Sequence, residues 1–127
     1  MTKNAEAVAL AYMDAVTAKD FARLEAIFAP NIKFEGPSRS IDNRTELMDA
    51  LRRMSAILVK NDVKRVFSDG SEVCVIYDVV TDAIAPLPTV EWLTINEGRI
   101  QSIKLFYDQV PWQKAREEMA KRAQARA

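Results

Sequence analysis

Residues 12–37 read YMDAVTAKDFARLEAIFAPNIKFEGP, and this stretch decides the fold. Its first part continues an apolar stripe of helical spacing, which predicts a helix over residues 4–18. Asp20 is a suitable N-cap for a second, short helix over residues 21–28, and the proline that follows would end that helix. Apolar and charged residues then alternate over residues 32–35, which is typical of a half-buried strand.

The rest of the chain predicts a third helix, four more strands and a helical tail. After a loop over residues 37–42, Asn43 and Glu46 have the spacing of a capping box, and the helix that they begin runs to about Leu58. The predicted strands cover residues 60–68, 72–82, 89–96 and 99–108, with tight turns at Asp69-Gly70 and Glu97-Gly98.

Composition excludes several classes of protein. The 127 residues include 18 basic and 18 acidic side chains and no histidine. Balanced charge gives no general attraction to nucleic acid or to an anionic membrane. The missing histidine removes the commonest acid–base group, the commonest zinc ligand and any Ser-His-Asp triad. The only cysteine, Cys74, lies in an apolar strand and is expected to be an inert small hydrophobic residue rather than a nucleophile.

One domain is expected over residues 1–127, with a fold core over 1–111 and an alanine-rich helical tail over 112–127. The charged N-terminus has no long apolar run, which argues against a signal peptide or a membrane span. We therefore expect a cytoplasmic protein that uses no cofactor and no metal ion.

Strand alternation divides the sheet residues between two faces. The more uniformly apolar face is taken as the inner one, and we expect a ligand pocket there. One charged residue, Glu91, shares this face. A carboxyl group among apolar neighbours resists ionisation, and a neutral carboxyl group can donate a hydrogen bond to a carbonyl or an oxyanion. The expected pocket residues are Phe34, Val75, Tyr77, Val79, Leu93, Ile95, Ile103, Leu105 and Tyr107.

The outer face of the predicted sheet is also apolar. It carries Trp92, Phe106, Val90, Ile76 and Val80. A sheet with two apolar faces needs cover on both sides. The C-terminal helix could cover the outer face, but its apolar stripe is weak. A second copy of the chain is the better candidate, so the sequence predicts a homodimer through this face.

The order of these elements resembles the nuclear transport factor 2-like superfamily, which includes ketosteroid isomerase and the SnoaL-like polyketide cyclases. The resemblance implies an α+β fold in which a curved mixed sheet forms a cone-shaped barrel around N-terminal helices, and homodimers are common among its members. It places Tyr12 at the oxyanion-hole tyrosine of the isomerase and Glu91 at its protonated aspartate. Gly36 stands where the isomerase has its general base. Asp108 matches an acid that is frequent in SnoaL-like sequences.

Each of these candidate catalytic residues also has a structural interpretation. Tyr12 could be a core tyrosine, Glu91 a solvated residue at the rim, and Asp108 a residue that ends a strand. Arg39, beside the Gly-Pro loop, could bind an anionic ligand or be solvated. The basic residues of the tail could contact an acidic partner, although a solvated helix explains them as well.

Two functions remain open. The first is an isomerase- or cyclase-type enzyme that acts on an apolar, oxygenated small molecule, with Tyr12 and Glu91 stabilising oxyanion charge. In it a water molecule, Asp108 or the substrate would carry the proton. The second is a binding or dimerisation module that keeps the pocket without a base. Gly36 and the missing histidine favour the second function, and the acid on the apolar face favours the first.

Overall fold

A computed structural model describes residues 4–126, which form helices and strands around one curved sheet. The helices are α1 (Ala5–Ala18), α2 (Phe21–Ile27), α3 (Arg44–Met54) and α4 (Gln109–Arg126). The strands are β1 (Phe28–Glu35), β2 (Ser40–Ile41), β3 (Leu58–Asp69), β4 (Glu72–Thr81), β5 (Leu87–Asn96) and β6 (Arg99–Tyr107).

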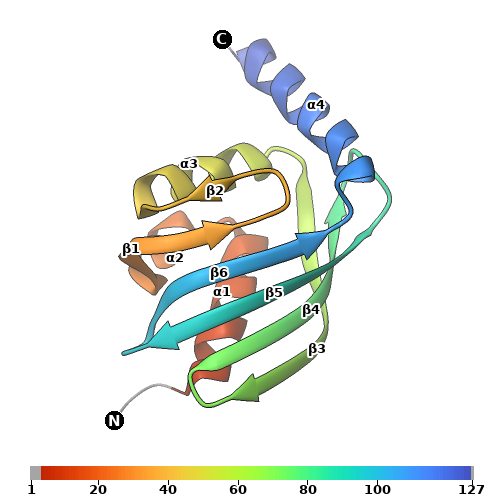
Figure 1. Cartoon of the computed structure of the whole chain (residues 1–127). Coiled ribbons are helices and arrows are strands. Elements are labelled where there is room, and N and C mark those ends of the chain that lie inside the picture. Colours follow the sequence, from red (N-terminus) through yellow and green to blue (C-terminus); the bar gives the residue numbers. More distant parts are fainter. Residues whose placement is uncertain (1–3, 127) are drawn as a thin grey trace.

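The sheet has the strand order β2-β1-β6-β5-β4-β3. The pairing of β1 with β6 is parallel, and the other neighbouring strands are antiparallel. Figure 1 shows the helices α1, α2 and α3 on one side of this sheet, while the side that faces the viewer carries no helix. The expected α+β fold with a curved mixed sheet is confirmed. The sheet is open, because β2 and β3 are its two edges.

The helix starts follow the sequence closely. Asp20 accepts a hydrogen bond from the backbone N–H of Arg23 at 3.2 Å, and Asn43 accepts one from the N–H of Glu46 at 2.9 Å. Both residues are therefore the N-caps that the sequence predicts. The capping box at α3 is only half formed, because the Glu46 carboxylate binds the guanidinium of Arg39 at 2.8 Å.

Several boundaries differ from the prediction. The third helix ends at Met54, four residues before the expected end, because Leu58 already pairs with Thr81 in the sheet. The expected loop over residues 37–42 contains the short edge strand β2.

Two strands begin earlier than predicted and include a proline. Pro88 lies in β5 opposite Asp78 of β4, but the pairing of β5 with β6 starts only at Thr89, so no ladder bond is lost on that side. Pro30 lies in β1 between Phe28 and Lys33, where the register with β6 shifts. Proline is tolerated at both places because the missing N–H has no strand partner to serve.

The hairpin between β5 and β6 has the predicted two-residue turn. Glu97 and Gly98 have φ angles of 53° and 75°, and Asn96 pairs with Arg99 on either side of them. Positive φ angles at both central residues are typical of a type I′ turn, whose backbone twist matches that of the two strands.

The C-terminal helix begins three residues before the predicted tail. Asp108 accepts a hydrogen bond from the N–H of Val110 at 3.0 Å, and Pro111 lies in the first turn, where a missing N–H costs nothing. Arg122 holds the helix to the strand connection through a bidentate ion pair with Asp82 at 2.8 and 3.0 Å. The helix contributes residues to the pocket described below rather than to the outer face of the sheet. None of the helices in residues 4–126 is long and apolar enough to cross a membrane.

Candidate functional site

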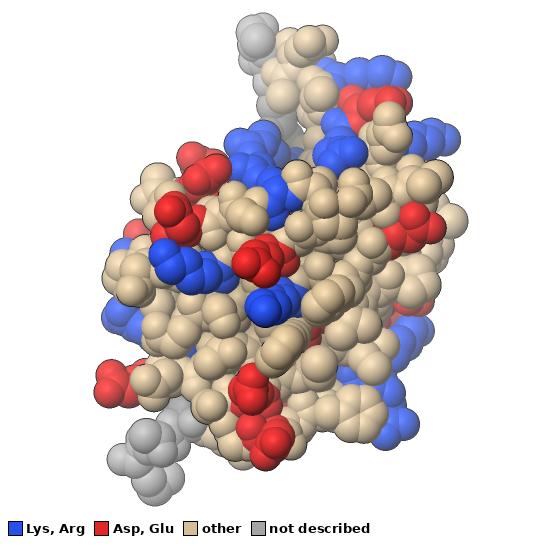
Figure 2. Space-filling view, in the orientation of Figure 1, with Lys and Arg blue, Asp and Glu red and all other residues tan. Residues whose placement is uncertain are grey.

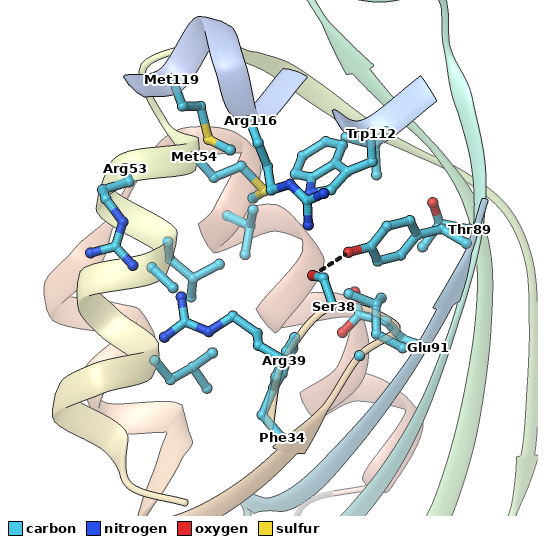
Figure 3. A pocket seen from close by; sticks show the side chains of 18 of the residues that line it. Phe34, Ser38, Arg39, Arg53, Met54, Thr89, Glu91, Trp112, Arg116 and Met119 are labelled. Carbon is cyan, nitrogen blue, oxygen red and sulfur yellow. Dashed lines mark hydrogen bonds between the residues drawn. The ribbon is translucent and has the colours of Figure 1, made fainter. Parts of the chain in front are cut away.

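A pocket of about 360 Å³ lies between the inner face of the sheet and the helices α1, α3 and α4. This volume falls in the range of small-molecule sites, which is roughly 300–1,000 Å³. Most of the lining is apolar. Side chains from α3 form one wall and those from the sheet form the other, with α4 across one end (Figure 3).

The sheet wall carries the one buried carboxyl group of the structure in residues 4–126, that of Glu91. Burial alternates strictly along β5, so Glu91 faces inward between Val75 of β4 and Leu105 of β6. Only 2% of its surface is exposed. The predicted placement of a lone acid on the apolar face is confirmed, and the alternative of a solvated rim residue is wrong.

Two tyrosines hold this carboxyl group. The hydroxyl of Tyr12 donates to Oε1 of Glu91 at 2.7 Å, and the hydroxyl of Tyr77 donates to Oε2. Tyr12 comes from the buried face of α1, where its ring packs edge-on against Phe28. Tyr77 lies opposite Thr89 in the ladder, diagonal to Glu91, and this spacing brings long side chains of neighbouring strands together. Both oxygens of the carboxyl group are therefore satisfied, as burial requires.

Burial raises the pKa of Glu91 from its ordinary value of 4.5 to about 7. Desolvation is the largest cause, and the hydrogen bonds from Tyr77 and Tyr12 oppose it by stabilising the charged form. Burial, followed by the negative charge of Glu91, raises the pKa of Tyr12 and of Tyr77 well above the ordinary tyrosine value. The two phenols thus remain donors, while the carboxyl group gains and loses its proton near neutral pH.

The expected base position is on the wall of the same pocket. Gly36 lines it, and its backbone N–H is bonded to the carbonyl of Arg39 at 2.9 Å. A Cβ atom added to Gly36 would meet the ring of Phe34 at 3.4 Å, which is ordinary contact. The position therefore has room for a Cβ atom, but the chain has glycine there and no acidic side chain. Next to it, the hydroxyls of Ser38 and Tyr107 are hydrogen-bonded at 3.1 Å (Figure 3).

The structure divides the nine expected pocket residues into two groups. The lining includes Phe34, Tyr77, Val79, Leu105 and Tyr107. The other four, Val75, Leu93, Ile95 and Ile103, are at most 3% exposed and belong to the packed core beneath the pocket. They share the inner face but lie where α1 and α2 fill it, and alternation alone does not distinguish the covered part of a face from the hollow part.

Asp108 lies apart from the other two catalytic candidates. It is outside the pocket lining, and its carboxylate caps the first turn of α4. Tyr12 and Glu91 are joined directly. The structure therefore brings two of the three candidates together and leaves the third at the exposed end of β6.

Sequence reasoning missed the second tyrosine and the contribution of α4. Tyr77 was expected only as a wall residue, although its place on the inner face of the strand next to Glu91 was visible. The helix α4 supplies Trp112, Arg116, Met119 and Ala123 to the lining. These residues recur at spacings of three or four, which is a helical stripe that the many alanines obscure.

Within residues 4–126 no group of three or more Cys, Asp and Glu side chains is arranged to hold a metal ion. The arginines at the pocket are the side chains best suited to bind an anionic group of a ligand.

The model of the SnoaL-like domain family matches residues 9–103 of this chain. A solved structure from Kribbella flavida DSM 17836 is 30% identical, with a TM-score of 0.80 over 90% of this chain and 94% of that chain. An NTF2-like protein of unknown function from Cytophaga hutchinsonii is 20% identical, with a TM-score of 0.80 over 89% and 97%. An LEH-like epoxide hydrolase from M. tuberculosis is 17% identical, with a TM-score of 0.75 over 99% and 98%. A comparison with curated proteins found no match.

Proposed function

This chain belongs to the family of SnoaL-like domains, and we propose that it is an enzyme that moves a proton on an apolar, oxygenated small molecule. Glu91 is the proton carrier, and Tyr12 and Tyr77 are the hydrogen-bond donors beside it. The observation that carries this proposal is a carboxyl group with a pKa of about 7, 2% exposed, on the wall of an apolar pocket.

A general acid–base group works best when its pKa lies near the working pH. Glu91 meets this condition without histidine, because desolvation moves its pKa into the range where histidine ordinarily titrates. A base at Gly36 is therefore not needed. Glu91, which stands at the position of the isomerase's protonated aspartate, takes the role of the base instead.

The proposed step is proton transfer next to a carbonyl group. Ionised Glu91 takes a proton from the carbon beside the carbonyl, the C–H electron pair becomes the C=C bond of an enolate, and the carbonyl oxygen takes the negative charge. Tyr12 or Tyr77, released as the carboxylate becomes neutral, donates its hydrogen bond to that oxygen. Returning the proton to a different carbon completes an isomerisation.

The test is hydrogen exchange on neutral ketones of medium size, measured by NMR in D₂O. We expect the protein to exchange protons next to the carbonyl, with a rate that rises with pH around a midpoint of about 7. Glu91→Gln should lower the rate by at least about a hundredfold, because loss of a general base typically costs that much. Asp78→Asn is the matched control, since this partly exposed carboxylate on β4 points away from the pocket.

Equal rates for the protein and its Glu91→Gln variant would contradict the proposal. A loss of exchange in Asp108→Asn as large as in Glu91→Gln would also contradict it, because Asp108 lies outside the pocket lining and would then take part in the proton transfer. Binding of ketones without any exchange would favour the second candidate, a ligand-binding module that has the same pocket and no turnover.

A further inference from the structure

The charged residues of the pocket are unevenly divided between its interior and its opening. The whole chain carries 18 basic and 18 acidic residues, but the pocket lining has three arginines against the single carboxyl group of Glu91. The arginines are Arg39, Arg53 and Arg116, and all three are exposed. A neutral protein has thus gathered positive charge at one opening.

The three arginines come from separate segments around the opening. Arg39 is in the turn before β2, Arg53 is in the last turn of α3, and Arg116 is in α4. Figure 3 shows the side chain of Arg116 extending from α4 toward the pocket beside Trp112, with Arg39 and Arg53 on the α3 side. In the space-filling view, basic side chains gather where α3 approaches α4 (Figure 2).

Two of the three arginines lack an acidic partner. Arg39 binds Glu46 at 2.8 Å, which leaves little net charge there. Among residues 4–126, neither Arg53 nor Arg116 takes part in an ion pair. The neighbouring Arg52 behaves differently, since it lies over the ring of Phe21 and beside Asp49.

We propose that the ligand is an amphipathic anion whose carboxylate lies at the opening of the pocket, attracted by the positive charges of Arg53 and Arg116 that line it. Its apolar body fills the cavity, and a carbonyl oxygen at its far end meets Glu91. The inference rests on the proposed function, because it concerns the substrate of the same site. Guanidinium groups bind carboxylates through parallel hydrogen bonds and give up their hydration more readily than ammonium groups, so they suit this half-open position.

The interior explains why the charge belongs at the opening. Apolar walls such as Phe34, Met54 and Leu87 cannot solvate an anion, and a carboxylate beside Glu91 would oppose its ionisation. An anionic end is therefore excluded from the sheet wall and favoured at the arginines. The two ends of the pocket fix the orientation of the ligand.

The experiment compares an oxodecanoate, with its ketone next to the terminal methyl group, with its methyl ester. Binding is followed by the fluorescence of Trp112, which lines the pocket, in a Trp92→Phe background. We expect the acid to bind about tenfold more tightly than the ester at low salt, since each exposed charge pair contributes roughly threefold. Higher salt should weaken binding of the acid only.

Arg53→Gln and Arg116→Gln should each remove about threefold of the preference for the acid. The matched controls are Arg52→Gln, the next residue of α3, and Lys114→Gln, an exposed cation of α4 outside the lining. Both controls should keep the preference. Equal affinity for the acid and the ester, equal losses in the controls, or no binding of either probe at millimolar concentration would overturn the inference.

Failure here is distinguishable from failure of the proposed function. In Glu91→Gln we expect the preference for the acid to persist while proton exchange is lost. A preference for the acid without exchange in the unchanged protein would leave this inference standing and refute the enzyme. Exchange on neutral ketones without any preference for the acid over the ester would support the enzyme and refute this inference.

Discussion

The two faces of the sheet treat neighbouring residues of β5 in opposite ways. Glu91 is a carboxyl group that is 2% exposed among apolar side chains, whereas Trp92 is an indole that is 39% exposed on the other face. Each is held by two neighbouring polar side chains. Two phenols bind the buried acid, and outside, Glu72 accepts from the indole N–H at 2.9 Å while Lys104 lies 5.0 Å from the ring.

The alternation of side chains along β5 decides which face each residue occupies, but it does not decide what covers that face. Inside, Glu91 is buried and bonded to Tyr12 and Tyr77, so desolvation and these hydrogen bonds set its pKa. Outside, the aromatic row continues through Phe67 and Phe106, which are 51% and 53% exposed, and no helix in residues 4–126 covers it (Figure 1). The inner face carries the pocket, and the outer face is an exposed apolar surface.

The largest effect is expected at the outer face, where we propose that two copies of the chain pair. Trp92→Arg would place a charge at the centre of an apolar interface and should convert the dimer to a monomer at micromolar concentration, with at least a hundredfold weaker association. Light scattering measures this mass directly. Val110→Arg is the control, since Val110 is also an exposed apolar residue, at 78%, but lies on α4.

A monomeric mass for the unchanged protein would refute the dimer. A dimer that survives Trp92→Arg would refute this interface, because the contact would then lie elsewhere.

The next effect concerns the stability of the inner face against pH. The folded-state pKa of Glu91 lies above its unfolded value, so the folded protein holds the proton more tightly. Its contribution to the free energy of unfolding is fully present below pH 4.5 and is lost as the pH rises through about 7. The shift corresponds to about 3 kcal/mol. Tyr12 and Tyr77 are the titratable groups that contact the carboxyl group, and both stay neutral throughout this window.

Glu91→Gln removes this titration. We expect the variant to be more stable than the unchanged protein at pH 8 and to lack the fall between pH 4.5 and 7, measured by urea unfolding across this range. Asp78→Asn should keep the original profile, because its carboxylate is on the other face of β4. A loss of stability in Glu91→Gln at pH 7 would show that the ionised carboxylate is stabilised in the fold, against its burial.

Much of the fold could be predicted because its signals are local. The caps Asp20 and Asn43, the turn at Glu97-Gly98 and the alternation along β5 each depend on a few adjacent residues. The start of β5 was predicted one residue after Pro88, because a proline usually marks the end of a strand. Pro88 is tolerated within β5 because β6 has no residue paired with it, and this pairing depends on the register of the whole sheet.

The site was predictable only in part. Glu91 was found because a lone acid interrupts an apolar face, and Tyr12 because of the family resemblance. The pair of hydrogen bonds that satisfies Glu91 needs Tyr77 on a different strand, at a diagonal that only the register fixes. The arginines at the opening come from segments 14 and 63 residues apart in the chain, and no local pattern connects Arg39, Arg53 and Arg116.

The smallest effect separates the two phenols from the rest of the pocket. The hydrogen bonds from Tyr12 and Tyr77 lower the pKa of Glu91, so deleting either one should raise it further above about 7. Tyr12→Phe and Tyr77→Phe should therefore lose about 1 kcal/mol more stability at pH 9 than at pH 5, because a hydrogen bond to a charged group is stronger than one to a neutral group. Carboxyl titration by NMR gives the pKa itself. Tyr107→Phe is the control, since that hydroxyl bonds Ser38 at 3.1 Å and not Glu91. Equal losses at both pH values would mean that the tyrosines support only the packing of the inner face and do not stabilise the ionised form of Glu91.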